Sequence, residues 1–466
     1  MPGKPFALAA HGATLGREIV GGATTFVALS YIVFVQPAVL AAAGMDPGAV
    51  LFATCVASAF ACFVMGLLAN LPVALAPAMG HNFFFAFTVC APIAAGGFGL
   101  AWPEALAANL ISGCLFLALS FLGLRKALME AIPRSLQLAI AAGIGLLIAL
   151  VGLRWAGIVV PHPSLYMQLG ALSHPVTLLS LAGLLVMGAL TALRIRGGLL
   201  IGMILTAAAG YLATRYLHVE PALVSPVQWG ALPDVSATAG KAVTGLGSLF
   251  SRPLETVVLV LFTFLLLDVF DTVGTLIGLG QQSGLMKNGK LPRARQALFA
   301  DALGTIAGTL LGTSTVTSYV ESSAGIAAGA RTGLAACVTG ALLLLSLVAY
   351  PFVGLFGTEV LVDASQLHPA LTTGQISCYP VIAPVLILIG CMMLSVVRDI
   401  DWQDLSEALP AFLTIIIMPL ASSITDGIAW GFIAYAALKL LTARPRQCPP
   451  IVYATAALFI AYYIVR

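Results

Sequence analysis

Charged residues are scarce in this chain: only 8% of its 466 residues are Asp, Glu, Lys or Arg, against 60% hydrophobic residues. A soluble protein carries about a quarter charged residues, so this chain has too few to cover a globular surface in water. The formal net charge of +3 is also too small to hold a polyanion, which excludes a nucleic-acid-binding protein. This composition therefore predicts a polytopic α-helical membrane protein.

Paired metal-binding or redox cysteines are missing as well. The 8 cysteines fall mostly within apolar runs and form no C-x-x-C pair, so we predict neither a bound metal nor a cofactor. The N-terminal residues lack the basic, apolar and cleavage regions of a signal peptide, and no removable leader is expected.

Apolar runs of about 20 residues, the length that crosses ~30 Å of hydrocarbon, recur along the chain. They predict regular spans at about 18–43, 48–69, 103–123, 136–153, 175–193, 198–216, 254–278, 296–312, 332–354, 380–397, 407–422 and 425–441. Two further segments, 71–92 and 313–330, are interrupted by Gly and Pro or by Ser and Thr, which makes about fourteen crossings. The apolar tail at 450–465 is short, and the sequence leaves open whether it spans the bilayer.

The basic residues indicate the orientation of these spans. Placing the N-terminus in the cytoplasm gives the inner loops most of the Lys and Arg, including Lys287, Lys290, Arg293 and Arg295. The outer loops then hold only Arg154, Arg215, Lys241 and Arg252. Because cytoplasmic loops are enriched in basic residues, we predict a multi-pass protein of a cell membrane of the bacterial inner-membrane type, with a cytoplasmic N-terminus and the lipid bilayer as its solvent.

Two interrupted segments occupy matching positions in the two halves of the chain. Residues 70–87 form the predicted third crossing and 312–329 the tenth, seven crossings later, so the second half is inverted relative to the first. Interrupted segments of inverted halves point to a substrate site near the middle of the membrane, where unwound backbone and helix N-termini face the ligand. Two kinked structural helices are the alternative.

Most acidic residues lie in loops or near the ends of predicted spans, and three do not: Asp268, Asp271 and Glu321. A carboxylate at the bilayer centre costs about 2.5–3.5 kcal/mol, so each must face a cavity or a partner. Asp268 and Asp271 are three residues apart on one helix face, and two such close carboxylates do not both ionise comfortably. We therefore expect proton carriers; structural hydrogen bonding and a sodium site with Thr272 remain alternatives.

The side chains of the interrupted segments suit a flat, polar ring. Glu321 can accept ring N–H groups, Asn82 offers both donors and an acceptor, and Phe83 to Phe85 and Tyr319 can stack on a planar ring. Together they describe a heterocycle with N–H donors and carbonyl acceptors. His81, beside Asn82, is interpreted as a structural hydrogen-bonding residue.

Several blocks of this sequence resemble one transporter family. ANLPVALAPAMGHNFF, DVFDTVGTLIG and GTSTVTSYVESSAG are similar to the AzgA-like purine permeases. These form the adenine, guanine and hypoxanthine branch of the nucleobase–cation symporters (the nucleobase–ascorbate transporter superfamily), which includes the bacterial uracil permease. The similarity covers nearly the whole chain, about 15–441.

This resemblance implies two inverted seven-span repeats that form a core and a gate. Spans 1–4 and 8–11 would make the core (1–130 and 253–356), and spans 5–7 and 12–14 the gate (131–252 and 357–466). The substrate would sit between them, where the discontinuous third and tenth segments meet.

The resemblance also implies roles for single residues. Glu321 would hold the purine beside the Tyr319–Val320 backbone, Asp268 would face the same base, and Asn82 would assist from the third segment. Asp271 would couple protons or hold the base in place. Two positions depart from the family pattern, in which an apolar residue is commoner at His81 and Asn at Gln36.

We therefore expect a secondary active transporter, not an enzyme, that imports adenine, guanine or hypoxanthine by proton symport through alternating access. A sodium-coupled nucleobase carrier is one alternative, and an anion carrier of the sulfate-permease type is another, which the acidic Glu321 disfavours. A membrane-embedded enzyme lacks support, because no His-x-x-x-His pair is present and both aspartates share one helix. The preferred purine and any homodimer stay open.

Overall fold

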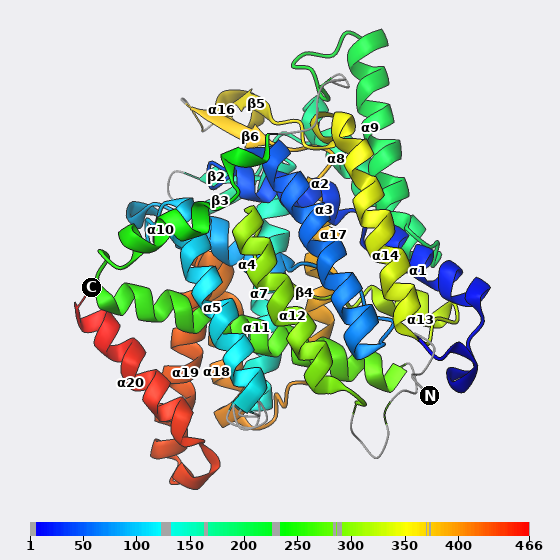
Figure 1. Ribbon diagram of the computed structural model, residues 1–466. Coiled ribbons are helices and arrows are strands. Elements are labelled where there is room, and N and C mark those ends of the chain that lie inside the picture. Colours follow the sequence, from blue (N-terminus) through cyan, green and yellow to red (C-terminus); the bar gives the residue numbers. More distant parts are fainter. Residues whose placement is uncertain are drawn as a thin grey trace.

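The computed structural model describes residues 6–122, 132–162, 166–225, 234–282, 286, 291–369, 371 and 374–465. Two basic residues of the predicted inner loop, Lys287 and Lys290, lie outside this part of the chain. Figure 1 shows an assembly of long helices, with short strands at its centre and along one edge.

The helices of the first half follow the predicted spans closely. They are α1 (Leu15–Leu29), α2 (Ile32–Ala41), α3 (Pro47–Val64), α4 (Met79–Phe84), α5 (Trp102–Leu122), α7 (Arg134–Trp155), α8 (Pro175–Ala192) and α9 (Gly198–Tyr216). α1 and α2 run as one apolar segment, interrupted at Ser30 and Tyr31. A π-helical turn, η2 (Met65–Ala69), extends α3, and another, η3 (Phe85–Val89), extends α4.

The second half of the chain also combines long and short helices. They are α10 (Lys241–Leu249), α11 (Leu254–Gln282), α12 (Ala294–Leu311), α13 (Ser322–Ala327), α14 (Gly333–Leu345), α15 (Val353–Phe356), α16 (Ala364–Leu367), α17 (Ala383–Met393), α18 (Leu405–Leu420), α19 (Ile424–Leu441) and α20 (Pro450–Val465). The 3-10 turns η6 (Ser346–Phe352) and η7 (Leu394–Asp399) extend α14 and α17. The apolar tail is the helix α20, which packs on α19.

Within the described residues, 8 helices are long and apolar enough to cross a membrane, and the bent pair 333–348 and 350–356 would add one more. These helices support a multi-pass membrane protein. The remaining predicted crossings are shorter, broken or less apolar helices, so the fourteen-segment inverted repeat stays a prediction.

The helices pack in two groups that each combine both halves of the chain. In the first group, α12 packs on α3 and α5, α14 on α1 and α3, and α11 on α5. In the second group, α7 packs on α17 and α18, α19 on α18, and α8 on α9 and α17. Contacts between the groups include α4 with α7 and α1 with α9.

The two interrupted segments meet as a pair of short strands, β1 (Leu75–Pro77) and β4 (Val316–Ser318), which lie at the centre of Figure 1. They are antiparallel, with Ala76 opposite Thr317. Prolines in the first segment and β-branched Thr and Val in the second favour extended backbone over helix. Each strand supplies the backbone partners that the other would lack inside a bilayer.

Two further two-stranded sheets differ from the purely helical prediction. β2 (Val159–His162) pairs with β3 (Tyr166–Leu169), and β5 (Val360–Asp363) pairs with β6 (Gln375–Cys378). Both fall in the polar interruptions between predicted spans, where no apolar run required a helix.

Close helix packing in the first group depends on glycine. A Cβ added at Gly333 of α14 would lie 2.1 Å from the backbone oxygen of Gly66. We expect Gly333→Ala to lower the free energy of unfolding by about 1–3 kcal/mol, since backbone atoms must move apart. Thermal unfolding of the purified protein in detergent measures this loss. Gly247→Ala is the control, because a Cβ there meets nothing within 4 Å; equal stability of the two variants would contradict the packing argument.

Candidate functional site

A buried carboxylate that was not predicted from the sequence holds the pair of β1 and β4, here called the strand crossing, in place. Asp301 of α12 is fully buried, and its Oδ1 accepts hydrogen bonds from the Ser318 backbone N–H at 2.9 Å and from the hydroxyls of Thr317 and Ser318, both at 3.1 Å. Thr272 of α11 donates to Oδ2 at 2.8 Å. Asp301 thus ties β4 to α11 and α12. The signal available in the sequence was an acid within the predicted span 296–312, but it lies near the start of that span.

Glu321 lies three residues after the end of β4 and is oriented by Tyr31, between α1 and α2. The Tyr31 hydroxyl, at the interruption between α1 and α2, donates to Glu321 Oε1 at 2.7 Å. Val320, beside it, is 59% exposed, so the chain turns outward at this point. The Glu321 carboxylate and the exposed Val320 are therefore neighbours, and their binding of a purine, which the resemblance implies, stays a prediction.

Tyr319 hydrogen-bonds the segment that contains β1. Its hydroxyl donates to the Pro77 carbonyl at 2.5 Å, and its backbone N–H donates to the Ala74 carbonyl at 2.9 Å. The side chain is buried, so it stabilises the pairing of β1 and β4. Whether its ring also contacts a substrate stays a prediction.

Asp271 lies on an open face of α11. Its side chain is exposed, and one and two turns further on, a Cβ at Gly274 or Gly278 would meet nothing within 4 Å. Residues at this spacing share one helix face. Asp271 is also close enough to Glu321 and to Asp301 for the charge of each to repel that of Asp271 when ionised. The structure thus brings Asp271 and Glu321 together beside open space.

Asp268 is buried, with 1% of its surface exposed, one turn before Thr272 on α11. It is therefore in the same helix region as Asp271 but more enclosed. Direct contact between Asp268 and a substrate stays a prediction.

Asn82 belongs to a buried hydrogen-bond network. Its Nδ2 donates to Gln36 Oε1, and its Oδ1 accepts from the Ser314 hydroxyl. Gln36 also donates to Thr313 at 3.0 Å and to Ser314 at 3.1 Å. The amide therefore joins α2, α4 and the segment before β4, and contact between Asn82 and a substrate stays a prediction. Phe83 is likewise buried, with its ring centroid 5.2 Å from that of Phe87.

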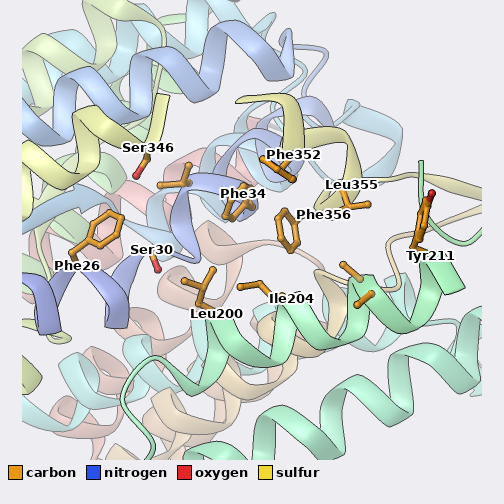
Figure 2. Close-up of a pocket in the computed structure, with 13 residues that line it drawn as sticks. Phe26, Ser30, Phe34, Leu200, Ile204, Tyr211, Ser346, Phe352, Leu355 and Phe356 are labelled. Atoms are coloured by element: carbon orange, nitrogen blue, oxygen red, sulfur yellow. The ribbon is translucent and has the colours of Figure 1, made fainter. Parts of the chain in front are cut away.

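A cavity of about 550 Å³ lies elsewhere, between α1, α2, α9 and α15 (Figure 2). Its lining is aromatic and aliphatic: Phe34 and Phe356, for example, have ring centroids 4.3 Å apart. None of the intramembrane acids lines it, and its few hydroxyls cannot match the hydrogen-bonding edges of a polar ring. We therefore place the polar site at the strand crossing.

In the described part of the chain, no group of three His, Cys, Asp or Glu side chains could hold a metal ion. The carboxyl groups at the crossing are suited to binding N–H groups and protons.

Comparison with known proteins identifies the family of this chain. Residues 16–360 match the model of a family described as the Permease family. The chain belongs to this permease family. The guanine/hypoxanthine permease PbuG of Bacillus subtilis is 41% identical over 462 residues, covering 97% of each chain. The adenine permease AdeP of Escherichia coli is 38% identical over 458 residues, covering 98% of this chain and 94% of that protein.

These relatives confirm the predicted resemblance to purine permeases, and a permease is a transporter rather than an enzyme. Among solved structures, the transmembrane domain of the cyanobacterial bicarbonate transporter BicA has a TM-score of 0.61 at 17% identity, covering 88% of this permease chain and 97% of that chain. At this identity the likeness shows the fold alone: a membrane-transporter fold.

Removal of the Asp301 carboxylate tests its structural role. In Asp301→Asn, an amide NH2 group replaces one carboxylate oxygen and cannot accept there, so either the Thr272 bond at Oδ2 or the Thr317 and Ser318 bonds at Oδ1 are lost. We expect the free energy of unfolding to fall by about 1–3 kcal/mol for each donor left without a partner. Thermal unfolding reports the loss, and Asp399→Asn is the control, because its exposed ion pair with Arg398 contributes about 0–1 kcal/mol. Unchanged stability in Asp301→Asn would show that the crossing does not depend on this carboxylate.

Proposed function

We propose that this permease imports a purine nucleobase (adenine, guanine or hypoxanthine) together with protons, by alternating access. The observation that carries the proposal is the pair of carboxyl groups, Asp271 and Glu321, beside open space at the crossing of β1 and β4. The permeases PbuG and AdeP, at 41% and 38% identity over nearly the whole chain, support a purine as the substrate.

The chemistry of the site suits a purine. A purine presents ring N–H donors next to acceptors on one edge, and a carboxylate oriented by Tyr31 accepts such donors well. The exposed residue Val320 lies beside this carboxylate, where a ligand can reach it. Gly274 leaves room beside α11 for a flat ring.

Coupling to protons follows from the charges. The charges of Asp301 and Glu321 repel that of Asp271, so binding a proton to Asp271 or Glu321 relieves repulsion. Reorienting the loaded carrier costs less free energy when its substrate site is neutral than when the site is charged. The membrane potential contributes about 2.3 kcal/mol per charge per 100 mV, which supports accumulation.

Alternating access requires two bodies that move past each other. We assign the group of α1, α3, α5, α11, α12 and α14 to the core and the group of α7 to α9 and α17 to α19 to the gate. Their separate packing supports this division, with predicted boundaries 1–130, 131–252, 253–356 and 357–466, except that α10, which falls in the gate range, packs on α5 of the core. We place the protein in the cell membrane with its N-terminus in the cytoplasm.

One observation favours protons over sodium. In the sodium alternative, Thr272 would join Asp268 and Asp271 as a ligand, but its hydroxyl donates to Asp301 and lies 2.8 Å from the Thr317 hydroxyl. That hydroxyl is thus already part of the structure that holds β4. An anion carrier would place its substrate beside three acids, which repel it.

Uptake of labelled hypoxanthine, adenine and guanine by cells expressing the protein tests the proposal. We expect accumulation that collapses with an uncoupler, rises as external pH falls and ignores replacement of Na⁺ by K⁺. Accumulation that ignores the uncoupler and the external pH would exclude proton coupling.

The same assay tests the two carboxyl groups. Asp271→Asn and Glu321→Gln should each lower the initial rate at least tenfold, because one loses a proton site and the other an acceptor for the purine N–H, at about 1.4 kcal/mol per factor of ten. Asp399→Asn, an exposed aspartate, should transport normally. Normal uptake by Glu321→Gln, with equal protein in the membrane, would rule out this site.

A further inference from the structure

A histidine deep in the structure has no role in the site described above. His81 of α4 is 1% exposed, and neither of its ring nitrogens has a hydrogen-bond partner among the described residues. A neutral imidazole carries one donor and one acceptor, and each one left unpaired in the interior costs about 1–3 kcal/mol. This cost indicates that the imidazole bonds another group, either through a water molecule or by sharing a proton with it.

Two contacts fix the level of His81 against α11. The rings of Phe84 and Phe264 have centroids 4.7 Å apart. At the other end, Thr272 bonds Thr317, which lies opposite Ala76 in the strand pair. The third segment from residue 76 to 84 therefore runs antiparallel to α11 from 272 to 264. The residue of α11 level with His81 is Asp268.

Both side chains lie on the facing sides of their helices. His81 is three residues before Phe84, and Asp268 is four residues after Phe264 and four before Thr272, spacings that keep residues on one helix face. α4 and α11 are in contact along this stretch. Thr263, next to Phe264, also has a buried hydroxyl without a partner among the described residues, which favours ordered water in this interface.

Among the described elements that contact α4, the ionisable side chain at the height of His81 is Asp268. α4 also contacts α2 and η3, which contain no titratable side chain, and α7, whose Ile144 faces Gly80. The two arginines of α7, Arg134 and Arg154, are each ten residues from Ile144, or about 15 Å along the helix. On α11, Glu255 lies at the first turn and Asp271 points to the open face.

We propose that His81 and Asp268 form a proton-sharing pair across the α4–α11 interface, bridged directly or by one water, with His81 as the positioning residue. With its proton loaded, the pair is neutral overall, either as carboxylic acid and imidazole or as carboxylate and imidazolium. Loss of one proton leaves carboxylate and neutral imidazole, with a charge of −1. This inference rests on the proposed function, because the pair would set the pH at which the transporter loads its proton.

Infrared difference spectroscopy of the protein in nanodiscs tests the pair without transport. The carboxylic C=O band that disappears in Asp268→Asn reports the protonation of Asp268. We expect His81→Leu to move the pH midpoint of this band by about one unit, the size of shift that a neighbouring charge gives. His11→Leu, which removes an exposed histidine near the N-terminus, should leave the midpoint unchanged. Identical midpoints in wild type and His81→Leu would overturn the pair.

Uptake measurements distinguish the two proposals. The pH midpoint of purine uptake should shift in His81→Leu in the same direction as the infrared midpoint, and His81→Asn serves if the leucine variant does not reach the membrane. A wild type that takes up no purine, with the infrared shift present, would refute the proposed transport and leave the pair standing. Normal purine uptake with no shift in either midpoint would refute the pair and leave the transport standing.

Discussion

The pairing of β1 with β4 is the constraint on which the rest of the site depends. A chain that leaves the helical state inside a bilayer exposes backbone N–H and C=O groups that water cannot reach. Here the two broken segments satisfy each other, and Asp301 binds the second strand through the backbone of Ser318 and the hydroxyls around it. Extended backbone at this depth is stable because the two segments are paired and anchored from α12.

This crossing determines where function can reside. The same turn of chain that ends β4 presents Glu321, and the helix that braces β4 presents Asp271 on its open face. The acids are thus held by a rigid element while their outward sides stay accessible, the arrangement that precise ligand binding requires. The apolar cavity between α1 and α9 lacks such groups and is therefore distinct from the polar site.

Much of this arrangement could be predicted from local sequence. The interruptions near 71–92 and 313–330 were recognisable because Pro, Gly, Ser and Thr break long apolar runs, and Asp271 and Glu321 were recognisable because acids are rare there. Asp301 was missed because its partners come from two other segments, α11 and β4, which no local pattern reveals. The direction of Asn82 was equally hidden, since it depends on how α2 brings Gln36 against it.

A structure determined with bound hypoxanthine tests the central claim most directly. The account predicts density for the flat ring beside β4, with a ring N–H donating to the carboxylate of Glu321 and with Asp271 on the same side. Density for the base in the apolar cavity, or at any position remote from Glu321, would contradict it.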